Sequence, residues 1–233
     1  MRHGSGVHDD RPARRSLYTV AMTRLRTAGR VSATWLILIA ALAAALGLWF
    51  GTRQFGAPPR ADLSAAVFYP APRALPEFRL SRSDGQALTL ADWKGRWTVV
   101  FFGFTNCPDV CPTTLTTFKQ VWKTLDAATA AKLRFDFISV DPARDTPEQL
   151  ARYVGYFSKD FVAATGSDEE LTRLTRALGL IYSRGEPVDG TYSVDHSASA
   201  VIVDPQGRQV GLFRPPFEAA KIAADLKTLA DGP

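Results

Sequence analysis

The sequence predicts an α/β domain, a central mixed sheet flanked by helices, preceded by one transmembrane helix. Residues 98–104 form a short apolar run, which indicates a strand buried on both faces of a sheet. Further strand patterns alternate with helical patterns after it, as expected of an α/β fold. Ahead of the domain, residues 31–52 carry no charged side chain and are long enough to cross a bilayer as a helix.

The positive charge of the chain lies at its N-terminus. Residues 1–30 hold seven Arg and two Asp, which equals the whole net charge of +5. Residues 53–233 are left with 21 of the 28 basic and 21 of the 23 acidic residues. Because this part has no excess of basic residues, we expect no nucleic-acid partner. The basic cluster before residues 31–52 predicts a single-pass protein of the inner (cytoplasmic) membrane, with its C-terminal domain on the periplasmic side.

Four regions are therefore expected: a basic cytoplasmic tail at 1–30, a transmembrane anchor at 31–52, a tether at 53–76 and a folded domain at 77–233. The apolar stretch continues through Trp49 and Phe50 after its alanine run, which favours an anchor over a cleaved signal peptide. Met22 heads a more compact version of the same signal, so translation could also begin there. The expected tether is rich in Ala, Pro and Arg.

The first half of the domain follows a strand-and-helix order. Alternating residues 78–81 and 87–90 flank Asp84-Gly85, which predicts a hairpin. The central strand at 98–104 precedes a helical pattern from Pro112 to about Ala128, with a proline in its first turn. A strand at 133–140 comes next.

The second half closes the sheet. Thr146 and Pro147 predict the cap and first residue of a helix, and residues 167–170 form a capping box for a helix through Leu178. A second hairpin is expected at 198–203 and 209–213, followed by a helix at about 217–229. The strand–cysteine–helix unit and this closing hairpin and helix are typical of a thioredoxin-like fold.

The cysteine pair is the first candidate site. Cys107 and Cys111 are the only cysteines of the chain. A cysteine between a strand and a helix is favoured as thiolate by the positive end of the helix. Because the ring of Pro112 would clash with the carbonyl of Pro108 deep inside a helix, we expect both cysteines on a turn just ahead of it. Such a turn can bring both sulfurs to one metal ion or to each other, and a structural disulfide is the ordinary alternative in an exported domain.

One imidazole is available to join the two thiols. His196 is the only histidine after residue 52, since His3 and His8 lie in the basic tail. It directly precedes the first strand of the closing hairpin, which neighbours the cysteine strand in a thioredoxin-like sheet. Two thiolates and one imidazole suit Cu(I), which accepts three ligands, whereas zinc would require a fourth.

Three blocks of sequence resemble the Sco/SenC family of copper proteins, namely residues 101–113, 139–147 and 194–197. The resemblance covers roughly residues 75–230. It implies a thioredoxin fold that holds copper through Cys107, Cys111 and His196. The expected ion is Cu(I), with Cu(II) as an alternative. It also implies a copper metallochaperone that delivers copper to the CuA centre in subunit II of cytochrome c oxidase, or reduces its cysteines. The metal-free, oxidised state would hold a Cys107–Cys111 disulfide.

Other residues near these blocks carry weaker expectations. Asn106 stands where many family members have His, and Thr114 where many have Glu, so a fourth ligand at 106 is in doubt. Asp109, Asp141 and Asp195 are auxiliary candidates that would tune the ligands. The block that begins at Asp141 is either a local turn with a helix cap or, by the resemblance, a loop that helps to dock the partner.

Two other functions compete with copper delivery. One is a membrane-anchored thiol–disulfide oxidoreductase, with Cys107 as the attacking thiolate and Cys111 as the resolving thiol. The other is a structural disulfide in an interaction domain. Residues 195–198 contain no proline, where thioredoxins carry a cis-proline before the strand that faces the cysteines. We therefore do not class the protein as an enzyme unless the cysteine pair acts as a reductase.

Overall fold

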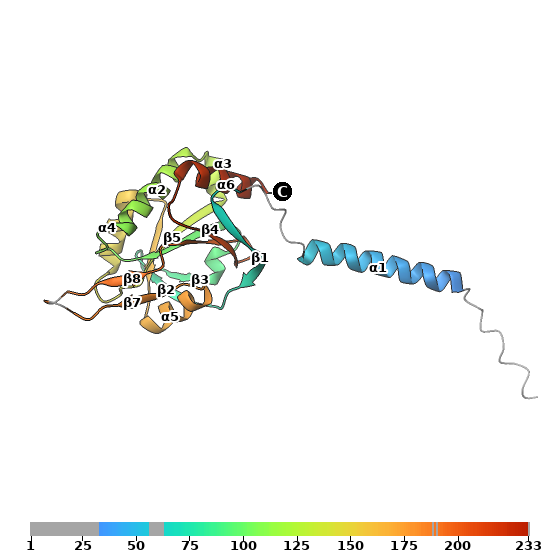
Figure 1. The fold of residues 1–233 in the computed structure, drawn as a ribbon, viewed down its shortest axis with the longest axis horizontal. Helices are drawn as coiled ribbons and strands as arrows, with labels where there is room; N and C mark the ends of the chain where they lie inside the picture. Colours follow the sequence, from blue (N-terminus) through green and yellow to red (C-terminus); the bar gives the residue numbers. More distant parts are fainter. Residues whose placement is uncertain (1–32, 56–62, 188, 190, 233) are drawn as a thin grey trace, which may run out of the picture. The chain divides into compact units, whose positions relative to one another are not determined.

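The computed structural model describes residues 33–55, 63–187, 189 and 191–232. The chain divides into two compact units, residues 1–56 and 57–233. The first unit contains helix α1 (Ala33–Phe55), drawn in blue in Figure 1. Among the described residues, no helix has both the length and the hydropathy that crossing a membrane requires. The expected basic tail and residues 31–32 of the expected anchor lie outside the described residues.

The second unit is built on an eight-stranded mixed sheet with the order β1-β10-β9-β4-β5-β6-β2-β3. The central strand β4 pairs in parallel with β5 and antiparallel with β9. The expected central sheet is thereby confirmed, as is the prediction that the first strand of the closing hairpin neighbours the cysteine strand. The strands are β1 (Ala66–Ala74), β2 (Arg79–Arg82), β3 (Ala87–Thr89), β4 (Trp97–Gly103), β5 (Leu133–Ser139), β6 (Val162–Thr165), β9 (Ala200–Val203) and β10 (Arg208–Phe213).

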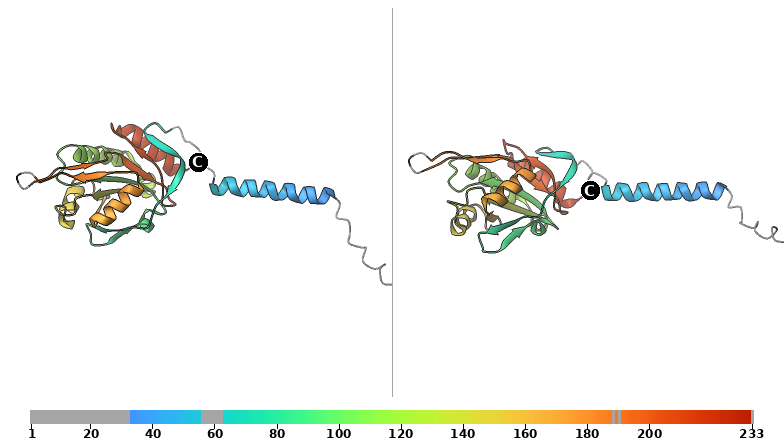
Figure 2. Two further views of the ribbon diagram at one scale, coloured as in Figure 1. Left: turned by 60° about the horizontal axis from the view of Figure 1, so that its bottom comes forward. Right: turned by 90° about the horizontal axis from the view of Figure 1, so that it is seen from below.

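Helices cover both faces of this sheet. α2, α4 and α6 lie together on one face, and α5 lies on the opposite face (Figures 1 and 2). Large aromatic side chains fill the space between the layers, because strands of a buried sheet present apolar residues to both faces. Phe101 of β4 and Phe118 of α2 are fully buried. The helices are η1 (Leu90–Trp93, 3-10), α2 (Val110–Thr124), α3 (Ala127–Ala131), α4 (Pro147–Phe157), α5 (Asp168–Ala177) and α6 (Ala219–Asp231).

Local capping explains where the helices begin. The side chain of Thr146 accepts a hydrogen bond from the backbone N–H of Gln149, and Pro147 is the first residue of α4. Ser167 caps α5 in the same way, as expected, whereas the carboxylate of Glu170, the other member of the expected capping box, accepts from Arg173. The single helix expected at 112–128 is divided, because the carboxylate of Asp126 accepts from the N–H of Thr129 and starts α3.

The N-terminal boundary of the domain differs from the expectation. β1 lies where a tether was predicted, and it pairs antiparallel with β10. Its two prolines fall where the register shifts between Phe68 and Arg73, and β1 is an edge strand, which tolerates proline. Buried Asp225 of α6 accepts the N–H groups of Ala65 and Ala66 at 2.8 Å each. The boundary at 77 was wrong because an edge strand containing prolines resembles a linker in sequence.

The hairpin formed by residues 182–184 and 194–196 was not expected. β7 (Tyr182–Arg184) and β8 (Val194–His196) pair antiparallel in a separate two-stranded sheet, which forms the orange ribbon with the long loop in Figure 1. His196 lies in β8, opposite Tyr182. Strands of three residues are too short to produce a clear alternation of apolar and polar residues, so the sequence pattern did not reveal them.

Candidate metal centre

The two cysteines lie where β4 passes into α2. Cys107 precedes the helix and is half-buried, whereas Cys111 lies in the first turn and is fully buried. The expectation that both cysteines lie ahead of the helix is therefore wrong for Cys111. Pro112 is the third residue of α2, a position whose N–H has no acceptor within the helix, so the proline removes no helical hydrogen bond.

Hydrogen bonds fix the loop that carries Cys107. Thr105 donates to the carboxylate of Asp145 twice, from its N–H at 2.9 Å and from its hydroxyl at 2.6 Å. The N–H of Cys107 donates to the carbonyl of Phe104 at 3.3 Å. The N–H of Cys111 donates to Sγ of Cys107 at 3.4 Å. This last contact places a helix N-terminal amide against the Cys107 sulfur and so fixes the position of the sulfur.

The end of β4 leaves no room for a side chain at Gly103. A Cβ atom there would lie 2.7 Å from Sγ of Cys111 and 2.9 Å from the ring of Phe137. The glycine therefore allows the Cys111 sulfur to pack directly against the backbone of the central strand. A glycine inside an otherwise apolar strand pattern was the sequence signal for this close approach.

His196 reaches the cysteines from β8. Its Nδ1 lies 3.2 Å from the carbonyl oxygen of Ser197, which can only accept, so we assign the proton to Nδ1. Nε2 then carries the lone pair, and it lies 3.4 Å from Sγ of Cys111. The rings of Phe101 and Phe104 pack edge-on against the imidazole, with centroids 5.8 and 5.9 Å away. These contacts hold the imidazole with Nε2 toward the thiol.

One ligand atom from each of Cys107, Cys111 and His196 lies within 4.8 Å of the others. The three residues that the sequence selected are thus brought together, and among the described residues they form the one such group found. Both cysteines are free thiols. Two sulfurs and one imidazole nitrogen form a soft donor set, which fits Cu(I) by its chemistry.

Burial controls the protonation of this group. Desolvation raises the pKa of the Cys111 thiol well above its usual range, and the charges of Cys107 and Asp145 act in the same direction. Burial lowers the pKa of His196, so its imidazole is neutral at neutral pH. Burial also raises the pKa of the Tyr153 phenol, which lies near both cysteines. Binding of a cation here must therefore release a thiol proton.

The three auxiliary carboxylates do not belong to this group. Asp109 is exposed at the start of α2, where it accepts a hydrogen bond from the hydroxyl of Thr113 at 3.2 Å. Asp195 is exposed and neighbours His196 in β8, so the two side chains point to opposite faces. Asp141 is fully buried and accepts from the hydroxyl of Tyr192 at 2.5 Å.

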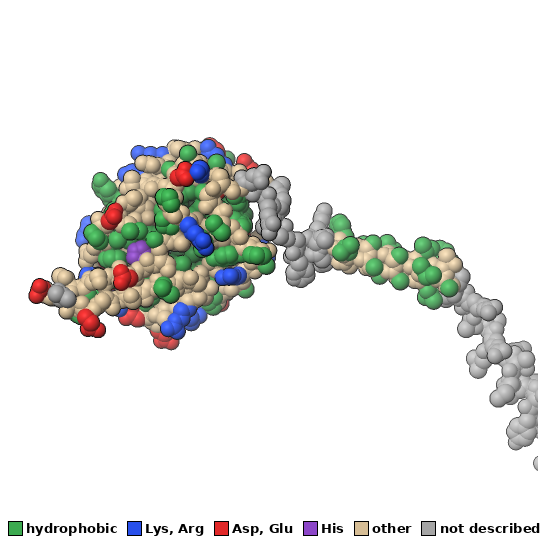
Figure 3. Space-filling model, viewed as in Figure 1, with side chains coloured by type: hydrophobic (Ala, Val, Ile, Leu, Met, Phe, Trp, Pro, Cys, Tyr) green, Lys and Arg blue, Asp and Glu red, His purple; other side chains and the backbone are tan. Residues whose placement is uncertain are grey.

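A cleft of about 270 Å³ opens beside Cys107 and His196. Most of its side chains are uncharged, and Val110 on its rim is 42% exposed. Hydrophobic side chains are exposed on the face of the domain drawn in Figure 3. The lining residues are Phe104, Asn106, Cys107, Pro108, Val110, Tyr192, Ser193, Val194, Asp195, His196 and Ala198.

Sequence reasoning missed the residues that support this site. Thr105 holds the cysteine loop, and Tyr192 contacts the block that contains Asp141 and Arg144. The motif at 139–147 marked that block as special, but nothing in the sequence pointed to Tyr192. Its contact with Asp141 joins residues 51 positions apart, which only the fold brings together.

The fold and the site define a class of protein: a thioredoxin-type domain that presents two thiols and one imidazole at the end of its central strand. The chain belongs to the SCO1/SenC family, whose family model matches residues 69–231. It is 39% identical over 153 residues to the human mitochondrial SCO1 homolog, covering 65% of this chain but only 51% of that protein. A Stutzerimonas stutzeri protein whose name proposes copper binding is 38% identical over 170 residues, 73% of this chain and 83% of that protein.

Solved structures agree with this assignment. Bradyrhizobium japonicum ScoI, with copper bound, superimposes with a TM-score of 0.61 at 34% identity, covering 67% of this chain and 99% of that chain. Yeast Sco1, with copper bound, gives a TM-score of 0.62 at 28% identity, covering 66% and 87% of the two chains. These copper-bound relatives and the Cys–Cys–His group of this chain together support copper binding.

Proposed function

We propose that this protein is a copper metallochaperone for the assembly of cytochrome c oxidase. Cys107, Cys111 and His196 hold Cu(I), and the domain passes it to the CuA centre in subunit II of the oxidase. The observation that carries the proposal is the convergence of these three soft donors within 4.8 Å in a family with copper-bound members. Whether Cu(II) is also held depends on a further hard ligand, and Asn106 at the rim of the cleft offers only an amide.

A second function uses the same cysteines. In thiol–disulfide exchange, the Cys107 thiolate attacks an acceptor disulfide, breaks its S–S bond to release one acceptor thiolate, and forms a mixed disulfide with the other sulfur. Cys111 then displaces the acceptor thiolate, which leaves a Cys107–Cys111 disulfide and a reduced acceptor. The half-exposed Cys107 and the buried Cys111 favour this order of attack. Copper delivery needs the cysteines of the acceptor reduced, so one protein can perform both steps.

A copper titration tests the ligand set. The reduced domain, residues 57–233, is titrated with Cu(I) against a chromophoric chelator, and His196→Ala is compared with wild type. We expect one tightly bound Cu(I) and a loss of about 10- to 100-fold in affinity for the variant. Asn106 lines the same cleft but is not a soft donor, so Asn106→Ala serves as the matched control. Equal affinity of wild type and His196→Ala would remove His196 from the site.

A transfer experiment separates delivery from reduction. Cu(I)-loaded protein is mixed with the reduced, metal-free CuA domain, and metal-free reduced protein is mixed with the same domain in its disulfide form. We expect His196→Ala to fail in copper transfer while it still reduces the disulfide, because both thiols that carry out the exchange remain. Reduction by wild type without any copper transfer would instead favour the oxidoreductase.

We also propose that residues 31–52 anchor the domain at the inner membrane, with the domain on the periplasmic side. The support is the sequence: an uncharged apolar stretch that follows seven Arg. Because the chain has only two cysteines, a membrane-impermeant maleimide tests the orientation in spheroplasts of an expressing host. We expect Cys107 to be labelled in intact spheroplasts and the protein to resist alkaline extraction. Labelling only after lysis would contradict the orientation.

A further inference from the structure

One loop contacts both segments that carry the candidate ligands. The β5–α4 loop, defined here as residues 140–146, joins β5 to α4 and lies between the cysteine loop and the β7–β8 hairpin. Its two aspartates, Asp141 and Asp145, are 0% and 1% exposed. Two buried carboxylates in one short loop require several hydrogen-bond donors, and these donors come from opposite sides of the site.

Asp145 holds the cysteine side. Its carboxylate accepts from the N–H and the hydroxyl of Thr105, two residues before Cys107. It also accepts from the hydroxyl of Ser139 at 2.5 Å. The position of the Cys107 loop is therefore tied to the end of β5 through one buried carboxylate.

Asp141 holds the histidine side. Its Oδ1 accepts from the hydroxyl of Tyr192 at 2.5 Å, and its Oδ2 accepts from Nε of Arg144. Arg144 also donates from Nη1 to the carbonyl of Tyr192 at 3.0 Å, and its guanidinium lies 3.8 Å from the centroid of the Tyr192 ring. Tyr192 thus makes three contacts with the loop, and it lies four residues before His196.

The two sides are joined through Ser139, the last residue of β5, and through the backbone of the loop. The hydroxyl of Ser139, which donates to Asp145, accepts from the N–H of Asp141 at 3.0 Å. The N–H of Asp145 donates to the carbonyl of Asp141, also at 3.0 Å. Movement of one carboxylate therefore displaces the other.

The hairpin needs such external support. β7 and β8 pair with each other in a sheet of their own, three residues in each strand. An isolated two-stranded hairpin is marginally stable in water. Arg184 of β7 provides one further contact with the loop by donating to the carbonyl of Val140 at 2.9 Å. The position of His196 thus depends on contacts outside its own sheet.

We propose that the β5–α4 loop is a brace that holds His196 at binding distance from the two cysteines before the metal arrives, and that Tyr192 is the positioning residue through which it acts on the histidine. The proposal rests on the proposed copper function, and it explains how that site is preorganised. A site already in its bound geometry loses less conformational freedom on binding and therefore binds more tightly.

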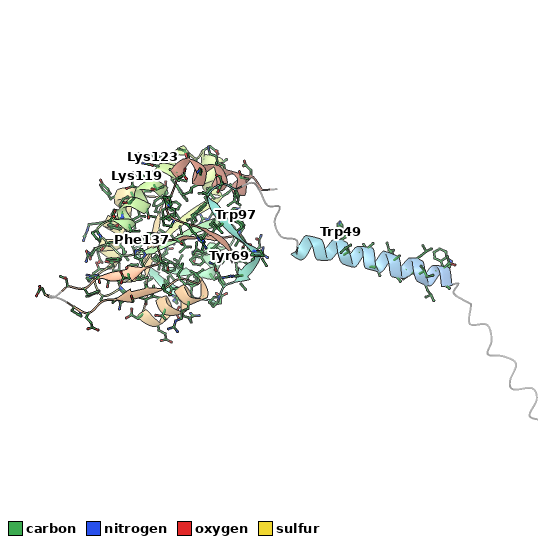
Figure 4. The ribbon with its side chains drawn as sticks, viewed as in Figure 1. Trp49, Tyr69, Trp97, Lys119, Lys123 and Phe137 are labelled. Carbon is green, nitrogen blue, oxygen red and sulfur yellow. The ribbon has the colours of Figure 1, made fainter. Side chains whose placement is uncertain are left out.

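A double-mutant cycle on Cu(I) affinity tests the brace. We expect Tyr192→Phe to weaken binding about tenfold in the wild-type background, but to have no effect in the His196→Ala background, because it acts through the imidazole. Thr105→Val instead loosens the loop that carries Cys107, so the loss of Cu(I) affinity that it causes should be the same in both backgrounds. Tyr69→Phe is the matched control: its hydroxyl accepts from Gln209 at 3.1 Å on edge strand β1 (Figure 4), and we expect unchanged affinity.

A second readout does not depend on copper. In the metal-free protein, NMR of the His196 imidazole should show the Nδ1-protonated form in wild type and in Tyr69→Phe, and averaged signals in Tyr192→Phe. An equal loss of affinity from Tyr192→Phe in both backgrounds, or unchanged imidazole signals in this variant, would overturn the brace. If His196→Ala alone leaves the affinity unchanged, the proposed ligand set fails, while the imidazole signals still decide the positioning role.

Discussion

Sγ of Cys111 lies 3.4 Å from Nε2 of His196, although the two residues are 85 positions apart in the chain. The thiol comes from the first turn of α2 and the imidazole from β8, which belongs to a separate sheet. With Nδ1 protonated, the Nε2 lone pair faces the Cys111 thiol and can accept its proton. A metal ion that replaces this proton finds both donors in place.

Gly103→Ala should disturb both the fold and the site. The new Cβ would meet the Cys111 sulfur at 2.7 Å, so either the sulfur or the Phe137 ring must move. We expect a loss of about 1–3 kcal/mol in the free energy of unfolding, measured with denaturant, and weaker Cu(I) binding. Gly155→Ala in α4 is the matched control, because its Cβ would meet nothing within 4 Å. The free energy of unfolding of this control variant should increase by up to about 1 kcal/mol.

Asp109→Asn should change the Cu(I) affinity only modestly. Its carboxylate is exposed and accepts from the hydroxyl of Thr113, outside the group of three ligand atoms. A carboxylate oxygen is also a poor ligand for Cu(I). The chelator titration measures the effect, and a loss as large as that of His196→Ala would show that the ligand assignment is wrong.

The reduced, metal-free domain should lose stability at alkaline pH. Burial raises the pKa of Cys111 from its ordinary value of 9.0, so the folded chain holds the thiol proton more tightly than the unfolded chain. The stabilisation of the folded state by this buried thiol is fully present below pH 9.0. It is lost as the pH rises above 9.0, because the thiol of the unfolded chain then ionises. Denaturant unfolding at a series of pH values should therefore show a steeper decline for wild type than for Cys111→Ala. Parallel curves would contradict the burial of this thiol.

Arg134→Met should destabilise the fold and spare the site. Nε of Arg134 donates to buried Asp136 at 2.6 Å, and Nε1 of Trp93 donates to the same carboxylate at 2.7 Å. Burial already raises the pKa of Asp136, and removing its cation should cost about 3 kcal/mol in the free energy of unfolding. Arg134→Met with Asp136→Asn should recover part of this loss. The Cu(I) affinity should stay unchanged, because the substituted residue, Arg134, lies near the start of β5, at the opposite end from Ser139.

Much of the fold follows from local patterns. Asp84-Gly85 determines the β2–β3 hairpin, where Gly85 has a φ of 83°. The apolar run at 98–104 marks the central strand, and the caps at Thr146 and Ser167 mark two helices. β1 and the β7–β8 hairpin could not be predicted, because their pairing partners lie far away in sequence or their strands are only three residues long.

The sequence by itself singled out the three residues of the candidate site, since the chain offers two cysteines and one histidine after residue 52. Only the tertiary structure decided how they are held: Cys111 buried against Gly103, and His196 on a hairpin tied to Asp141 through Tyr192. The physical reason is that residue type defines the donor chemistry, whereas distance, burial and pKa arise from contacts between segments that are far apart in the chain.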